Sequence, residues 1–242
     1  MILSVVSAKG GVGKTTVTAN LGVLLHKRGV KVLLVDADLA SGDLTLQLGG
    51  KSGPRGLNTL LSSEKVSEDE VLKTVSPASG VPLLPVIPSL RAYLKAKLDL
   101  FPSVLSPLKD QYDLIVVDTP PGVNKNSIVP LTESDRVLLV TTPDPIAVSD
   151  VSTSRDVAVL LEKSVVGVVI NRFRKGFLLG SKQLKPREVE NILKLKEIGV
   201  IPEDKAVEAS ILAKKPLVLY KPRSPASKAF GSLARRLMEE LG

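Results

Sequence analysis

The fold of this chain is decided by the stretch Lys9-Gly10-Gly11-Val12-Gly13-Lys14-Thr15-Thr16. The stretch follows a short apolar run and precedes apolar positions at helical spacing, so it connects a buried strand to an amphipathic helix. Its glycines permit positive φ angles and let backbone N–H groups approach an anion, and the start of the helix adds partial positive charge. The pattern predicts a phosphate-binding loop, in which Lys14 contacts the β- and γ-phosphates and Thr15 offers its hydroxyl to Mg²⁺.

One position departs from the strict phosphate-loop pattern, because Ala8 stands where that pattern has glycine. A glycine-rich turn between strand and helix is one alternative, but packing does not account for Lys-Thr at the start of the helix. A dinucleotide-binding fold is another, since Gly11 and Gly13 could begin its fingerprint. That fold wants glycine or alanine where Thr16 stands, and a lysine inside the loop is foreign to it.

Short apolar runs of strand length alternate with helical patterns along the chain. They are Ile2–Val6, 31–35, 113–117, Arg136–Thr141, 165–170 and 198–201. Such runs are typical of parallel strands that are covered by helices on both faces. A further run at 81–87 contains Pro82 and Pro85, which suit an edge or irregular strand. We therefore expect a doubly wound, mostly parallel α/β sheet flanked by helices, with residues 1–242 forming one domain built around the phosphate-binding loop.

Several helix boundaries can be placed from local signals. Gly29 should close the helix that begins at Lys14. Ser67 and Glu70 form a capping box, and Pro186 suits the first turn of a later helix. In doubly wound folds ligands bind at the carboxyl ends of the strands, and the phosphate loop follows one of these ends.

Composition narrows the class of protein. The chain has 242 residues, no cysteine and one histidine, His26, which excludes disulfides, thiol nucleophiles and sites built from Cys or several His. Neither a signal peptide nor a run of 18 apolar residues is present, so we expect a cytoplasmic protein. The net charge is +8, which favours polyanionic partners or simply keeps the surface solvated.

Acidic residues follow two of the predicted strands. Asp36 and Asp38 come after the run at 31–35, and Asp118 follows the run at 113–117. Carboxylates at the ends of buried strands are costly unless they meet a cation or hydrogen-bond donors, and Mg²⁺ with its waters would satisfy them. Simple capping of a turn is the alternative for Asp36 and Asp38. An acid after an apolar strand, in a chain with a phosphate loop, predicts that Asp118 holds Mg²⁺ through a water. Asp43 receives no chemical role.

The phosphate loop and these acids together resemble the ParA/MinD family of ATPases, whose deviant Walker A motif tolerates a non-glycine residue at the position of Ala8. The resemblance covers nearly the whole chain and lies closer to the MinD branch. It implies that Lys9 reaches across a dimer interface to the partner's nucleotide phosphates. It also implies that Asp36 belongs to the outer shell of Mg²⁺ and that Asp38 orients the attacking water.

Two further segments concern the nucleotide base. Asn171 and Arg172 follow the run at 165–170, and an Asn amide offers the donor and the acceptor that an adenine edge requires. The family resemblance implies that Asn171 reads adenine, and that Pro202 and Glu203 belong to a loop packed over the base. Either segment alone is more often an ordinary turn. Because the chain lacks a guanine-recognition motif, the two together favour ATP over GTP as the ligand.

The resemblance leaves the cargo open. A stripe of apolar residues in the helix expected at 227–241 suggests either packing on the sheet or membrane contact, and we expect packing, with no added membrane anchor. Two runs of lysine and arginine residues could bind DNA without reading its bases, as ParA proteins do, or could simply form a solvated surface. The runs are Arg172, Arg174, Lys175, Lys182, Lys185 and Arg187, and Lys214, Lys215, Lys221, Arg223, Lys228, Arg235 and Arg236.

The expected function is therefore that of an Mg-ATP-dependent ATPase, which forms a homodimer with ATP and is accelerated by a partner protein in cell-division or DNA positioning. Three alternatives remain: a ParA-like partition ATPase that binds DNA non-specifically, a dethiobiotin-synthetase-like ligase of the same fold, and a nucleotide-binding regulator that hydrolyses little. A ligase would need a substrate pocket beside the γ-phosphate, whereas Lys9 suits a dimer better.

Overall fold

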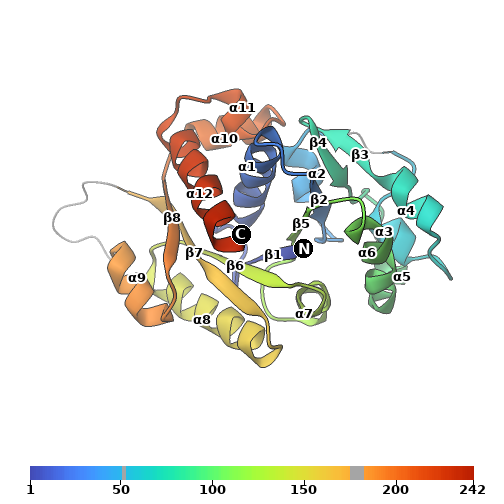
Figure 1. The fold of residues 1–242 in the computed structure, drawn as a ribbon, viewed down its shortest axis with the longest axis horizontal. Helices are drawn as coiled ribbons and strands as arrows, with labels where there is room; N and C mark the ends of the chain where they lie inside the picture. The colour runs from blue at the N-terminus through green and yellow to red at the C-terminus, as the bar shows by residue number, and fades with distance from the viewer. Residues whose placement is uncertain (51–52, 175–182) are drawn as a thin grey trace.

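The sheet has eight strands in the order β3-β4-β2-β5-β1-β6-β7-β8 (Figure 1). The computed structural model describes residues 1–50, 53–174 and 183–242. All neighbouring strands are parallel except β3 and β4, which pair antiparallel. The strands are β1 (Ile2–Val6), β2 (Val32–Asp36), β3 (Ser76–Ala78), β4 (Val81–Leu84), β5 (Leu114–Asp118), β6 (Arg136–Thr141), β7 (Ser164–Phe173) and β8 (Glu197–Pro202). The predicted doubly wound, mostly parallel fold is confirmed.

Helices cover both faces of this sheet (Figure 1). One face carries α1 (Lys14–Lys27), α2 (Asp43–Gln47), α10 (Ala206–Leu212), α11 (Leu217–Tyr220) and α12 (Pro225–Leu241). The opposite face carries α3 (Leu57–Leu61), α4 (Glu68–Thr74), α5 (Leu90–Lys95), the 3-10 turn η1 (Leu98–Leu100) and α6 (Phe101–Lys109) over one half. Over the other half lie α7 (Lys125–Thr132), α8 (Pro145–Leu160) and α9 (Pro186–Leu193). The buried hydrophobic side chains are all Val, Leu, Ile or Ala apart from Phe101 and Phe230, as the scarcity of aromatic residues requires.

The predicted helix signals lie where the structure begins and ends its helices. Gly29, at φ 89°, follows α1. The Ser67 hydroxyl accepts the Glu70 N–H at the start of α4, and Pro186 opens α9. The expected helix at 227–241 begins two residues earlier, because Ser224 provides the cap and Pro225 the first turn.

The sheet edge differs from the prediction. The strand expected at 81–87 ends at Leu84, and the carbonyl of Pro85 accepts the Leu57 N–H instead of continuing the ladder. The outermost strand is β3, a three-residue strand that the sequence analysis did not include. A tight turn through Ser79 and Gly80, both at positive φ, joins β3 to β4. Prolines occur in both strands, which is tolerated here because the sheet ends at this hairpin.

The closing helix α12 packs against the sheet, as expected. Phe230, Leu233 and Leu237 are completely buried in the core on that face. The fit is tight, because a Cβ on Gly199 in β8 would lie 2.9 Å from a methyl group of Leu233. Across the described ranges, no helix combines the length and apolar character needed to cross a membrane.

Candidate functional site

The phosphate loop connects β1 to α1, as predicted. Gly11 and Gly13 adopt φ angles of 80° and 89°, which side chains rarely accept. Gly13 is also the N-terminal cap of α1, where no side chain caps the helix. A Cβ on Gly13 would lie 2.1 Å from Nδ2 of Asn171, so glycine is required there by space as well as by conformation. The uncapped N–H groups of the first turn are available to an anion.

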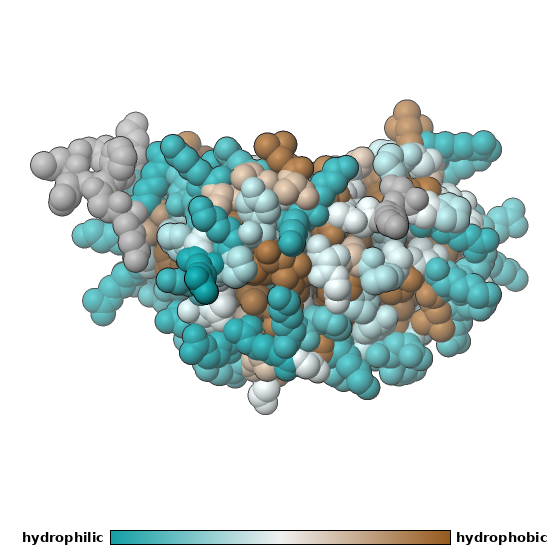
Figure 2. Space-filling model, turned by 90° about the horizontal axis from the view of Figure 1, so that it is seen from above, coloured by the Kyte–Doolittle hydropathy of each residue, from teal (hydrophilic) through white to brown (hydrophobic). Residues whose placement is uncertain are grey.

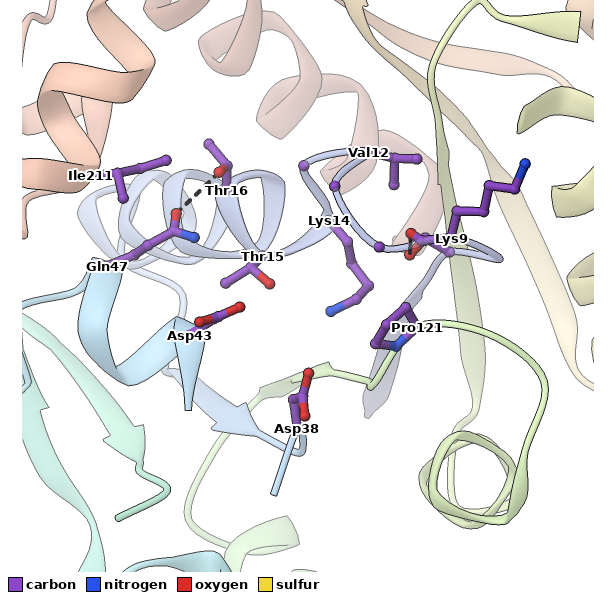
Figure 3. Close-up of a pocket in the computed structure, with 14 residues that line it drawn as sticks. Lys9, Val12, Lys14, Thr15, Thr16, Asp38, Asp43, Gln47, Pro121 and Ile211 are labelled. Atoms are coloured by element: carbon purple, nitrogen blue, oxygen red, sulfur yellow. Dashed lines mark hydrogen bonds between the residues drawn. The ribbon is translucent and has the colours of Figure 1, made fainter. Parts of the chain in front are cut away.

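Two adjoining cavities meet at this loop. The larger, of about 260 Å³, is lined by the loop and by Asp38, Asp43, Gln47 and Pro121, among others (Figure 3). The second, of about 180 Å³, is lined by the predicted base-end residues Asn171, Arg172, Pro202 and Glu203, among others. Both are lined by Gly11, Gly13, Thr16 and Ile211. The fold therefore places the predicted phosphate and base residues side by side along one continuous depression.

Asp118, the last residue of β5, is the centre of a buried polar cluster. Its Oδ1 accepts hydrogen bonds from Lys14 Nζ at 2.8 Å and from Thr18 Oγ1 at 2.9 Å. Its Oδ2 accepts the Thr15 hydroxyl at 2.8 Å. Lys14 and Asp118 are both buried, so the pair satisfies two charges that would otherwise be costly. The predicted phosphate-binding lysine, metal-binding hydroxyl and strand-end acid thus lie in direct contact.

Asp36 lies beside Asp118, because β2 and β5 pair in register at these residues. Its Oδ2 accepts two hydrogen bonds from Thr45, one from the backbone N–H at 2.9 Å and one from the hydroxyl at 2.8 Å. Its Oδ1 is buried and has no hydrogen-bond partner among the described residues. Burial, and then the negative charge of Asp118, raises the pKa of Asp36 to about 7. Sequence reasoning missed Thr45, since nothing in its neighbourhood marks it as a partner of Asp36.

The oxygens at this point fit a hydrated magnesium ion. Thr15, Asp36 and Asp118 supply the hydroxyl and carboxylate donors that Mg²⁺ prefers, and the unpaired Oδ1 of Asp36 is a buried acceptor that a metal-bound water would satisfy. Within residues 1–50, 53–174 and 183–242, no group of three or more His, Cys, Asp or Glu side chains could hold a metal by itself.

Asp36 is expected to make the ligand-free protein less stable as the pH rises. The pKa of its carboxyl is 3.8 in the unfolded chain and about 7 in the folded protein. The unfolded chain therefore loses this proton first, and the free energy of unfolding falls between these two pH values by on the order of 4 kcal/mol. Above that range the loss is complete and constant. Urea unfolding across this interval should show a flatter profile for Asp36→Asn than for the wild type, and parallel profiles would contradict the assignment.

Lys9 lines the larger cavity of its own subunit, but its ammonium group is directed away from that cavity. Its Nζ forms an ion pair with Oδ2 of Asp150 on α8 at 2.6 Å, and 49% of its side chain remains exposed. Lys14 points into the larger cavity, whereas Lys9 points away from it and away from Asp38 (Figure 3). Asp150 has no sequence signal that would link it to the loop. Its contact shows that the two lysines of the loop have different orientations.

The base end is held by contacts between the loop and β7. Nδ2 of Asn171 donates to the Val12 carbonyl at 2.8 Å, and Arg172 donates to the Gly11 carbonyl at 3.3 Å. The strand extends to Phe173, three residues beyond the expected end, with Arg172 at φ 58° where the register with β8 shifts. Beyond this contact the Asn171 side chain has a carbonyl oxygen and a second amide N–H, and the residue lines the second cavity.

Glu203 is fixed by two arginines at the rim of the second cavity. Its Oε1 lies 3.3 Å from Arg172, and its Oε2 accepts a hydrogen bond from Arg174 Nε. The hydrogen bond from Arg174 holds the pKa of Glu203 below its usual range. Sequence reasoning placed Arg174 in a basic run and missed this contact. Lys175 and Lys182 of the same run lie outside the described residues.

Known proteins are similar to this chain in sequence over most of its length. Residues 1–164 match the family model described as an AAA domain. An uncharacterized ATP-binding protein of Methanocaldococcus jannaschii is 34% identical over 234 residues, which cover 97% of this chain and 86% of that protein.

Solved structures agree over nearly the full length. The septum site-determining protein MinD of Pyrococcus horikoshii, complexed with Mg-ADP, is 30% identical with a TM-score of 0.90. The match covers 100% of this chain and 97% of that one. A chain of the MinC:MinD cell division protein complex of Aquifex aeolicus is 28% identical with a TM-score of 0.85, covering 98% of this chain and 96% of that one.

Proposed function

This chain belongs to the ParA/MinD family of P-loop ATPases, and on that premise we propose that it hydrolyses ATP as a nucleotide-switched homodimer in intracellular positioning. ATP and Mg²⁺ are its ligands. The observation that carries the proposal is the contact of Lys14 and Thr15 with Asp118 beside the unpaired Oδ1 of Asp36. Lys14 and Thr15 line a cavity that the phosphate loop surrounds, and Asp36 and Asp118 lie buried behind them.

The residues of the site have separate roles in hydrolysis. Loop N–H groups and Lys14 bind the phosphates, and Lys14 exchanges part of its contact with Asp118 for phosphate oxygens. Thr15, Asp36 and Asp118 would hold Mg²⁺, which would supply positive charge to the phosphates. Asp38 lines the cavity and accepts a hydrogen bond from the attacking water, which orients the water in line with the γ-phosphate. Asn171 and the loop containing Pro202 contact the adenine.

A second copy of the chain completes this site. Lys9 faces outward, so it can reach the phosphates of a subunit placed opposite and stabilise the charge that develops there. Large apolar side chains stand exposed in the segments that follow β5, β6 and β8, where Val123, Ile146 and Leu212 are 43%, 63% and 85% exposed. A facing subunit would cover them. The outward lysine also argues against a small-molecule ligase, because it serves no acceptor in its own cavity.

Nucleotide state is transmitted through the loop after β5. The N–H of Gly122 donates to the carbonyl of Ser7 at 3.0 Å, so this loop rests on the phosphate loop. Gly122 adopts φ 84°, which permits a hinge at that point. Contacts to the γ-phosphate hold both loops in the dimer, and hydrolysis releases them so that the subunits part. A partner protein that binds this dimer would accelerate the cycle, and a MinD from Aquifex aeolicus has been solved in a MinC:MinD complex.

The oligomeric state with each nucleotide tests this proposal. Asp38→Ala should bind Mg-ATP and remain a dimer, because the water is no longer oriented and the γ-phosphate persists. The wild type should be dimeric with Mg-ATP at first and monomeric with Mg-ADP. Light scattering after size-exclusion chromatography measures both states, and Asp110→Ala, at an exposed acid beyond α6, is the matched control. A monomer under every condition would remove the nucleotide switch.

A second candidate function is non-specific DNA binding. Lys214, Lys215, Lys221, Arg223, Lys228, Arg235 and Arg236 are all exposed. Of these, Arg236 alone forms an ion pair within the described residues, with Glu197 at 3.4 Å. Exposed cations without an acidic partner are suited to phosphate contacts. The wild-type protein with ATP should then retard long DNA in gels, and the retardation should weaken at high salt. Lys9→Ala should not retard the DNA. Equal retardation with and without nucleotide would contradict DNA binding that is switched by ATP.

A further inference from the structure

The short helix α2 runs along the larger cavity. Gly42 and Gly49 flank it at φ 65° and 64°, so the helix is bounded at both ends by backbone that favours glycine. Asp43 and Gln47, one helical turn apart, both line the cavity. Thr45, between them in sequence, donates to Asp36. The helix therefore directs several polar groups towards the nucleotide site, and Gln47 has no assigned role.

Gln47 contacts the phosphate loop at a defined point. The Thr16 hydroxyl donates to Oε1 of Gln47 at 3.1 Å, and Figure 3 shows the pair beside Ile211, away from Lys14 and Asp38. Thr16 and Ile211 line both cavities and so lie where the cavities meet, and Gln47 contacts Thr16 from the larger cavity. A nucleotide with its terminal phosphates near Lys14 and its base near Asn171 would place its α-phosphate and sugar at that junction.

We infer that Gln47 is a nucleotide-binding residue that donates a hydrogen bond from its amide to the α-phosphate. The inference rests on the proposed nucleotide binding. In the ligand-free structure Gln47 accepts the Thr16 hydroxyl. A phosphate oxygen is a stronger acceptor because it is charged, so the hydroxyl turns to the nucleotide. The carboxamide of Gln47 then rotates its N–H towards the same group, which fixes α2 against the ligand.

The α-phosphate is common to ADP and ATP. Gln47 therefore contributes equally to the affinity for both nucleotides and does nothing that is specific to the transition state. Lys9 and Asp38 differ, since their proposed roles concern the γ-phosphate and the water. A change at Gln47 should accordingly raise KM and leave kcat unchanged.

Gln47→Leu tests the inference, because leucine has a similar size and lacks the amide. Binding of Mg-ATP, Mg-ADP and adenosine is measured by titration calorimetry, together with steady-state hydrolysis. Loss of a hydrogen bond to a charged group is expected to weaken ATP and ADP alike by roughly tenfold, with adenosine unchanged. Gln47→Glu should weaken both further, because its carboxylate repels the phosphate. Leu46→Gln, on the exposed side of the same helix, should match the wild type.

The outcomes separate this inference from the proposed function. A wild type that binds neither nucleotide would remove the proposed function itself. If the wild type binds both nucleotides, three results for Gln47→Leu would overturn the role of Gln47. They are affinities equal to those of the wild type, a loss of affinity for ATP alone, and an equal loss of affinity for adenosine. Thermal unfolding without nucleotide checks that the variants fold. Should Gln47→Leu fail to fold, the comparison of Gln47→Glu with the wild type decides by the same criteria.

Discussion

Lys14→Ala is expected to abolish ATP hydrolysis, with a loss of about 10³-fold or more. The substitution removes the ammonium that should stabilise charge on the β- and γ-phosphates. It also removes the cation that pairs with Asp118 in the buried cluster, where Asp36 is already short of a partner. Asp118 would keep the hydroxyls of Thr15 and Thr18 alone. Binding of the triphosphate and organisation of the metal site should therefore fail together.

Phosphate release measures the first effect, and calorimetric titration with Mg-ATP measures the second. Lys27→Ala, an exposed lysine in the last turn of the same helix, should retain wild-type values and serves as the control. A thermal melt in the absence of nucleotide shows whether the variant folds. Hydrolysis by a folded Lys14→Ala protein within a few-fold of the wild-type rate would exclude the proposed catalytic loop.

Lys9→Ala is expected to lower hydrolysis by a similar factor while leaving ATP binding to a single subunit within a few-fold of the wild type. The physical reason is its orientation, since Lys9 pairs with Asp150 and does not contact the cavity floor of its own subunit. A charge that acts on the partner's phosphates contributes to the reaction in the dimer and little to the affinity of the monomer.

Mixing two inactive variants tests whether Lys9 acts across the dimer. In a mixed dimer of Lys9→Ala and Asp38→Ala, the subunit that carries Lys9→Ala retains Asp38 and receives Lys9 from the other subunit, so one site is complete. Equal amounts should restore about a quarter of the wild-type rate, because half of the dimers are mixed and each has one working site. If Lys9 acted within its own subunit, no mixed dimer would contain a complete site and the rate would stay at the level of the single variants.

Much of the fold could be predicted because its signals are local. The buried parallel strands are nearly continuous apolar runs, and the glycines and lysines of the phosphate loop stand together in eight residues. The hairpin strand β3 could not be predicted, since Ser-Pro-Ala has neither alternation nor strand-forming residues and forms a strand through its pairing with β4.

The candidate site divides in the same way. Its charged residues are recognisable from their positions after strands, so the acids at 36, 38 and 118 could be proposed from sequence. Their partners could not. Asp118 contacts Lys14, which lies 104 positions away in the sequence. Asp150 contacts Lys9 from helix α8. The position of Gln47 at the junction of two cavities depends on how α2 packs against α1, which no local pattern specifies.

The ion pair between Lys9 and Asp150 has a kinetic consequence. If Lys9 acts across the dimer as proposed, an isolated subunit with bound ATP keeps this lysine paired with its own Asp150 and lacks its charge at the triphosphate. ATP would then not be hydrolysed until two subunits with bound ATP form a dimer. Turnover per molecule should rise with protein concentration and reach a plateau once every subunit is paired, so that crowding of the protein at one place in a cell would itself set the rate at which ATP is consumed there.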